Sequence, residues 1–218
     1  MKYNLKIGFK KTMKFFLVFA GVFVIANLLY RYFLSDLSNL GISSKRIHVV
    51  VNDETKISYK IILIFFTPIV EEFLYRYGLV FSKNKTSLLL LGWIYTVYLF
   101  LKPDSIDIND PKTLMLFFAF YICLFFVLRF LISKHHNYIQ ELYKCKMTYI
   151  FSISVIFFAY SHFTLYSNYG DLTNILFSPI ILLTYFIAGA LYGFIRLKYG
   201  FVWCCLAHIM WNAYVVLN

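Results

Sequence analysis

The sequence predicts an all-α fold, namely a polytopic bundle of about seven transmembrane helices whose N-terminus faces the cytoplasm. Of the 218 residues, 61% are hydrophobic and only 14% are charged, against about a quarter in an ordinary soluble domain. The apolar residues fall in long continuous blocks, which is typical of helices surrounded by lipid. The net charge is +11, and the basic residues gather at the block ends, as in proteins anchored at a cytoplasmic membrane face.

The apolar blocks are predicted to be helices, because in lipid only helices and closed barrels satisfy every backbone polar group. Crossing a bilayer takes about 20 helical residues, and the third and seventh blocks are shorter than that. The predicted helices cover residues 15–34, 57–81, 87–101, 113–132, 147–165, 175–195 and 201–217.

Two regions follow from these blocks. Residues 1–56 are predicted to hold an N-terminal transmembrane helix and an external loop, and residues 57–218 to form the functional core. The first block is interpreted as an uncleaved span. It is longer than the apolar part of a secretory signal, and no small-residue cleavage site follows it.

The connections between blocks predict the orientation. With the N-terminus inside, the inner connections, including residues 134–146, are strongly basic, whereas the outer ones, including residues 102–112, carry most of the acidic residues. This asymmetry is typical of multi-pass proteins. The abundance of Lys, Asn, Ile, Phe and Tyr suggests an AT-rich bacterial genome, so the bacterial cytoplasmic (inner) membrane is the expected location. The basic charge is then explained by the lipid bilayer, and no nucleic-acid partner is expected.

Three ionisable residues lie inside the second block, where charges are expensive and usually face a bundle interior. Glu72 and Arg76 are four residues apart, so they share a helix face and can pair. Glu71 is rotated by about 100° from Glu72 and stays available as a general base. The alternative is a purely structural ion pair with a second glutamate beside it.

Two histidines lie in other blocks. His162 is in the fifth block, and His208 is in the last, four residues before Asn212. This spacing places His208 and Asn212 on one helix face, where both can donate hydrogen bonds to one developing oxyanion. The alternative for each is a polar residue that joins neighbouring helices. Gly189 and Gly193 form a small-xxx-small face, interpreted as intramolecular packing.

Together these residues form three motifs, Glu71-Glu72-x-x-x-Arg76, Phe158-x-x-x-His162 and His208-x-x-x-Asn212. In this order on separate helices, they resemble the EExxxR, FxxxH and HxxxN motifs of the CAAX protease and bacteriocin-processing (CPBP, or Abi) family of intramembrane endopeptidases. The resemblance covers about residues 65–218. One departure is Tyr77, which stands between the motif arginine and Gly78, where the family often has glycine directly.

The resemblance implies peptide-bond hydrolysis by a glutamate-activated water. Glu71 and His162 would orient and deprotonate the water, and His208 and Asn212 would stabilise the oxyanion. Arg76 would hold Glu72 as structural support. No cofactor is expected; a zinc site made by Glu71, His162 and His208 is the alternative.

The implied partner is a peptide or protein substrate at the membrane, in peptide maturation, signalling or self-immunity to a bacteriocin. A non-catalytic immunity or regulatory protein of the same fold is a second hypothesis. A transporter ranks last, because the chain has no internal repeat.

Overall fold

The computed structural model describes residues 57–101, 111–163 and 172–217, and every regular element within them is a helix. The predicted first span and external loop lie outside the described residues, as does most of the 102–112 connection. In chain order the elements are α2 (Ile57–Ile61), the π-helix η1 (Ile62–Phe66), α3 (Thr67–Tyr75), the 3₁₀-helix η2 (Tyr77–Leu79), α4 (Lys83–Leu101), α5 (Pro111–Lys134), α6 (His136–Ser161), α7 (Leu172–Ile181), α8 (Leu183–Tyr199) and α9 (Phe201–Leu217).

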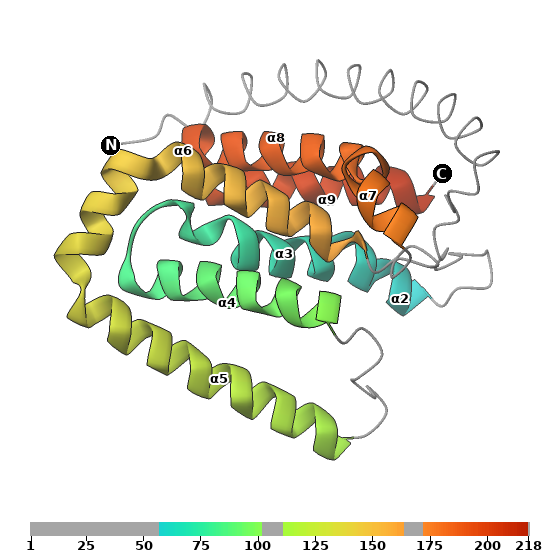
Figure 1. Cartoon of the computed structure of the whole chain (residues 1–218). Helices are drawn as coiled ribbons and strands as arrows, with labels where there is room; N and C mark the ends of the chain where they lie inside the picture. The colour runs from blue at the N-terminus through green and yellow to red at the C-terminus, as the bar shows by residue number, and fades with distance from the viewer. Residues whose placement is uncertain (1–56, 102–110, 164–171, 218) are drawn as a thin grey trace.

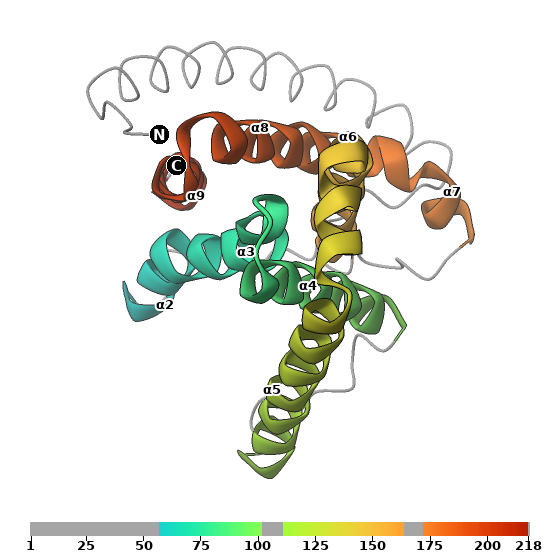
Figure 2. The same cartoon turned by 90° about the vertical axis from the view of Figure 1, so that its left-hand side faces the viewer.

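The core is a ring of helices. α3 contacts α4, α4 contacts α6, α6 contacts α8, α8 contacts α9, and α9 contacts α3 again (Figure 1). α5 packs along α4 and extends away from the ring in the second view (Figure 2). α3 carries Glu71 and Glu72, and it contacts α4, α6, α9 and η1.

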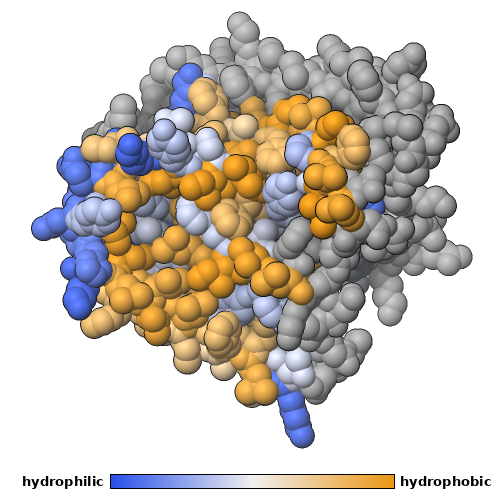
Figure 3. Space-filling view, in the orientation of Figure 1, coloured by the Kyte–Doolittle hydropathy of each residue, from blue (hydrophilic) through white to orange (hydrophobic). Residues whose placement is uncertain are grey.

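The described helices are of the membrane type. α5, over Met115–Lys134, and α6 are long and apolar enough to cross a membrane, and α7 with α8 forms a third candidate span with a bend of 47°. α9 is apolar but shorter. Apolar residues cover most of the described face in Figure 3, with hydrophilic residues at the end where α5 meets α6. Such a surface favours lipid contact, and the all-α membrane bundle is confirmed.

The predicted helix over residues 57–81 is not continuous. Between α2 and α3 the chain forms a π-helix, in which the backbone N–H of Thr67 donates to the carbonyl of Ile62, five residues earlier. The residue five positions after Leu63 is Pro68, which has no N–H to donate. The π-helix therefore leaves the Leu63 carbonyl to be satisfied by a side chain.

The prediction of a loop over residues 134–146 is wrong, because most of this segment is helical. α6 begins at His136, and only a kink at Lys146 (φ −122°, ψ 23°) interrupts it. Ile139, Leu142 and Tyr143 fall on one helix face and pack against the Leu79 and Leu89 cluster. This short apolar stripe stabilises a helix within an otherwise polar segment.

Candidate active site

Glu72 is fully buried, with an exposed fraction of 0%. Its Oε1 atom accepts hydrogen bonds from Nη1 of Arg76 at 2.6 Å and from Nδ1 of His208 at 2.8 Å. Its Oε2 atom accepts one from the Cys204 thiol at 2.6 Å. The pairing of Glu72 with Arg76 expected from their spacing is present. Because three donors satisfy this carboxylate, it joins α3 firmly to α9.

Arg76 follows the last residue of α3 and is also buried. Its guanidinium carbon lies 3.8 Å from the ring centroid of Phe158 on α6 and 5.4 Å from that of Tyr192 on α8. These contacts over aromatic faces complement its ion pair. Arg196 of α8 donates from Nε to the Arg76 carbonyl and from Nη2 to the Tyr77 carbonyl, both at 3.2 Å. The C-terminal end of α3 is therefore fixed by a second arginine.

The carboxylate of Glu71 faces two imidazoles. Its Oε1 lies 3.8 Å from Nε2 of His162, and its Oε2 lies 3.5 Å from Nε2 of His208. Both separations exceed the 2.7–3.2 Å of a normal N–H···O hydrogen bond, and Oε2 is buried without a hydrogen-bond partner among the described residues. The structure thus places His162 and His208 beside the carboxylate of Glu71, which has no Lys or Arg partner within the described parts of the chain.

His162 caps the end of α6 instead of lying within a span, since α6 ends at Ser161. Its Nδ1 lies 2.8 Å from the carbonyl of Phe158. A carbonyl can only accept, so the proton of the neutral ring belongs on Nδ1. The lone pair of Nε2 then points toward Glu71. The Nδ1 atom of His208 faces Glu72 in the same way, so Nδ1 carries a proton in both rings.

Asn212 lies one turn beyond His208, as predicted, but its amide is engaged elsewhere. Its Nδ2 donates to the main-chain carbonyl of Leu63 at 3.0 Å. This is the carbonyl that Pro68 leaves without a backbone donor in the π-helix. Asn212 therefore connects α9 to η1, and the second hydrogen of its amide group is not used by this bond.

The predicted glycine face is confirmed as intramolecular packing. A Cβ atom on Gly189 would lie 3.0 Å from Phe158 and 3.3 Å from Val155, and one on Gly193 would lie 2.6 Å from Phe151. All three neighbours belong to α6. The two glycines let α8 approach α6 closely enough to place Phe158 beside the acidic cluster.

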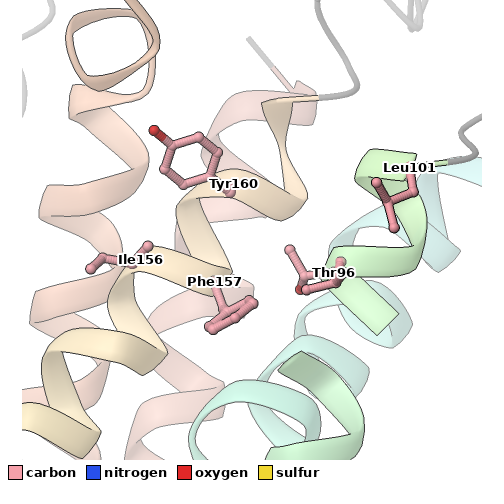
Figure 4. Close-up of a pocket in the computed structure, with 6 residues that line it drawn as sticks. Thr96, Leu101, Ile156, Phe157 and Tyr160 are labelled. Atoms are coloured by element: carbon pink, nitrogen blue, oxygen red, sulfur yellow. The ribbon is translucent and has the colours of Figure 1, made fainter. Parts of the chain in front are cut away.

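An apolar pocket of about 280 Å³ lies between α4 and α6, with Phe157 and Tyr160 of α6 opposite Thr96 and Leu101 of α4 (Figure 4). Thr96 at its wall accepts or donates a 2.8 Å hydrogen bond with Tyr75 of α3. Its lining residues are Thr96, Val97, Leu101, Ile156, Phe157 and Tyr160.

Among the described residues, no group of three or more His, Cys, Asp or Glu side chains is arranged to hold a metal ion. Glu71, His162 and His208 are close together, with 3.8 Å and 3.5 Å between the Glu71 carboxylate oxygens and the Nε2 atoms of His162 and His208. The predicted loop also contains two histidines and a cysteine. His135 precedes α6, whereas His136 and Cys145 lie within it. The Cys145 thiol donates to Glu141 at 3.5 Å.

Several residues of this site were missed from the sequence. Cys204 lies four residues before His208 on the same face, but a buried thiol gives no distinctive pattern. In the sequence Arg196 is an ordinary basic residue near a helix end, where an exposed side chain is expected. In the structure it is buried, with an exposed fraction of 7%. Tyr185 and Tyr192 are two among 19 tyrosines. Their seven-residue spacing on α8 is the signal that could have singled them out.

Residues 54–214 match the family model described as type II CAAX prenyl endopeptidase Rce1-like. This range contains all the residues of the acidic and histidine cluster. No curated protein and no solved structure matches the chain.

Proposed function

Because the chain belongs to the Rce1-like family of type II CAAX prenyl endopeptidases, we propose that it is an intramembrane endopeptidase that hydrolyses a peptide bond with a water activated by Glu71 and His162. The observation that carries the proposal is the position of the Glu71 carboxylate, which faces Nε2 of both His162 and His208. An acid-histidine cluster on three helices of a membrane bundle needs a functional reason, because each polar group is expensive there.

Glu71 acts as the general base. The gaps of 3.5–3.8 Å to the two imidazoles suit groups that share a third polar molecule. A water that donates to Glu71 and to Nε2 of His162 directs a lone pair at the substrate carbonyl carbon. Glu71 takes the proton as the new C–O bond forms, and the same proton then reaches the leaving nitrogen as the C–N bond breaks.

His208 and Asn212 stabilise the oxyanion. His208 donates from Nε2 when both of its nitrogens carry protons, and the Glu72 carboxylate at Nδ1 supports that positive charge. Asn212 supplies the amide hydrogen that its bond to Leu63 does not use. Loss of one such donor typically lowers the rate by about 10²–10³. Glu72 and Arg76 support the site as a buried pair.

The substrate is a peptide or protein at the membrane, and the reaction is a maturation or bacteriocin-immunity step in a bacterial cytoplasmic membrane. The proposed topology has about seven spans with the N-terminus inside. The basic residues near the junction of α5 and α6, such as Lys134, Lys144 and Lys146, support this orientation, because Glu141 is the only acidic residue in the segment 134–146.

The direct test is cleavage in proteoliposomes. Wild-type protein is incubated with a panel of membrane-anchored and prenylated peptides, and products are identified by mass spectrometry. We expect cleavage by wild type, none by Glu71→Gln, and wild-type cleavage by Glu141→Gln, whose carboxylate is exposed on α6. Absence of cleavage of the whole panel by the folded wild-type protein would favour the non-catalytic immunity or regulatory role.

A further inference from the structure

Both histidines of the site stack on tyrosines of one helix. The ring of His162 lies on Tyr185 with centroids 4.2 Å apart and an interplanar angle of 24°, and the ring of His208 lies on Tyr192 at 4.5 Å and 19°. Tyr185 and Tyr192 are seven residues apart on α8, which is about two helical turns. They therefore stand on one face of that helix, one above the other.

Each imidazole is confined in the same way. Its Nδ1 meets a fixed acceptor, the Phe158 carbonyl for His162 and the Glu72 carboxylate for His208. The ring of Phe158 also contacts each imidazole in an edge-to-face arrangement, with centroids 4.8 Å from His162 and 6.0 Å from His208 and interplanar angles of 65° and 80°. The tyrosine stacks on a face of the imidazole, and together these contacts restrict rotation of the ring about its side-chain bond.

The rest of this α8 face serves the same cluster. Gly189 lies between the two tyrosines and leaves the space that Phe158 occupies. Arg196, four residues after Tyr192, holds the carbonyls at the end of α3. Thus the residues at 185, 189, 192 and 196 contact the site in succession along one stripe. Helical spacing of three and four residues produces such a stripe.

We propose that Tyr185 and Tyr192 are positioning residues of the proposed endopeptidase, and that each fixes the orientation in which its histidine presents Nε2 to Glu71. The inference rests on the proposed function for its catalytic consequence. At Tyr192 the aromatic ring does the positioning, since its hydroxyl is buried with no hydrogen-bond partner among the described residues. At Tyr185 the stacked ring is the contact with His162. A small misplacement of a catalytic group can lower a rate by about 10²-fold.

The test compares ring-keeping with ring-removing variants. Tyr192→Phe and Tyr185→Phe should keep kcat within about three-fold of wild type, whereas Tyr192→Leu and Tyr185→Leu should lower kcat about 10- to 100-fold with KM changed less than about two-fold. Tyr199→Leu is the matched control. Tyr199 is a buried tyrosine of the same helix whose ring lies beside Phe194 at 6.4 Å. This variant should lower the melting temperature but leave kcat near the wild-type value.

A spectroscopic measurement separates this inference from the proposed function. In protein with ¹⁵N-labelled histidine, the ring signals of His162 and His208 should show a proton held on Nδ1 in wild type and in both Phe variants. The Leu variants should show mixed tautomers for the affected ring alone. If wild type cleaves nothing but the ring signals behave in this way, the proposed function fails and the positioning stands. Unchanged signals and unchanged kcat in the Leu variants, or an equal loss of kcat in Tyr199→Leu, would overturn it.

Discussion

The side-chain amide of Asn212 donates to the main-chain carbonyl of Leu63 across 3.0 Å, and so joins α9 to the π-helix before α3. One turn earlier, His208 bonds to Glu72. Two hydrogen bonds thus align α9 with the segment that carries both glutamates. The first of them exists because Pro68 cannot donate to Leu63.

This relationship predicts a coupling between Asn212 and Pro68. Asn212→Ala leaves the part-buried carbonyl of Leu63 unpaired and should lower the free energy of unfolding by about 0.5–1.5 kcal/mol. In a Pro68→Ala background the backbone N–H of residue 68 can reach Leu63, so Asn212→Ala should cost clearly less there. The measurement is a double-mutant cycle by melting in detergent. Strict additivity of the two substitutions would contradict the coupling.

The two adjacent glutamates should respond differently to loss of charge. Glu71→Gln keeps the shape of the side chain but removes the base, so cleavage should be lost while the melting temperature stays near wild type. Glu72→Gln leaves Arg76 without its buried partner, which should cost of order 3–5 kcal/mol.

Arg76→Ala should resemble Glu72→Gln in stability, because either change breaks the same ion pair. The three variants are compared by melting temperature and cleavage rate in one detergent. Full activity of Glu71→Gln would refute its assignment as the base. A stability loss confined to Glu71→Gln would exchange the roles of the two acids.

The orientation predicts which side of the membrane each connection faces. In a cysteine-free background, a cysteine at position 136 should resist an impermeant thiol reagent applied to intact cells, and one at position 107 should react. Permeabilised cells, in which both positions should react, serve as the control. Reaction at 136 but not at 107 would reverse the topology.

Metal removal tests the zinc alternative. Under the glutamate mechanism, a chelator should leave the cleavage rate unchanged, because Glu71 and the two imidazoles act on water and substrate directly. The matched control is the chelator already saturated with zinc. A loss of activity that zinc restores, and that the saturated chelator does not cause, would instead assign Glu71, His162 and His208 as metal ligands.

Short-range features of the site could be read from the sequence. The Glu72–Arg76 pair follows from a spacing of four residues, and the Gly189–Gly193 face predicts the close approach of α8 that the Phe151 and Phe158 contacts show. Both depend only on the geometry of one helix and on residue size.

Features that depend on contacts between helices could not be read in this way. The seven-residue spacing of Tyr185 and Tyr192 places both on one face of α8, but it does not reveal what that face contacts, because His162 and His208 come from other helices. The π-helix before Pro68 could not be predicted either. The hydrogen bond that Pro68 cannot donate to the Leu63 carbonyl is supplied by Asn212, 149 residues away in the sequence. The helical start of α6 was hidden by its polar residues, although Ile139, Leu142 and Tyr143 provide an apolar stripe.

The four-residue distance between Glu72 and Arg76 has a consequence for biosynthesis. The ribosome makes α3 long before His208, which stands 136 residues after Glu72. In the proposed topology, α3 therefore enters the membrane at the translocon without the partners that later surround it. Because Arg76 lies within the same segment, the nascent chain can neutralise Glu72 by itself, and only Glu71 adds to the insertion cost of about 2.5–3.5 kcal/mol per central charge. The Glu72–Arg76 ion pair therefore lowers the cost of inserting α3 before His162 and His208 have been synthesised.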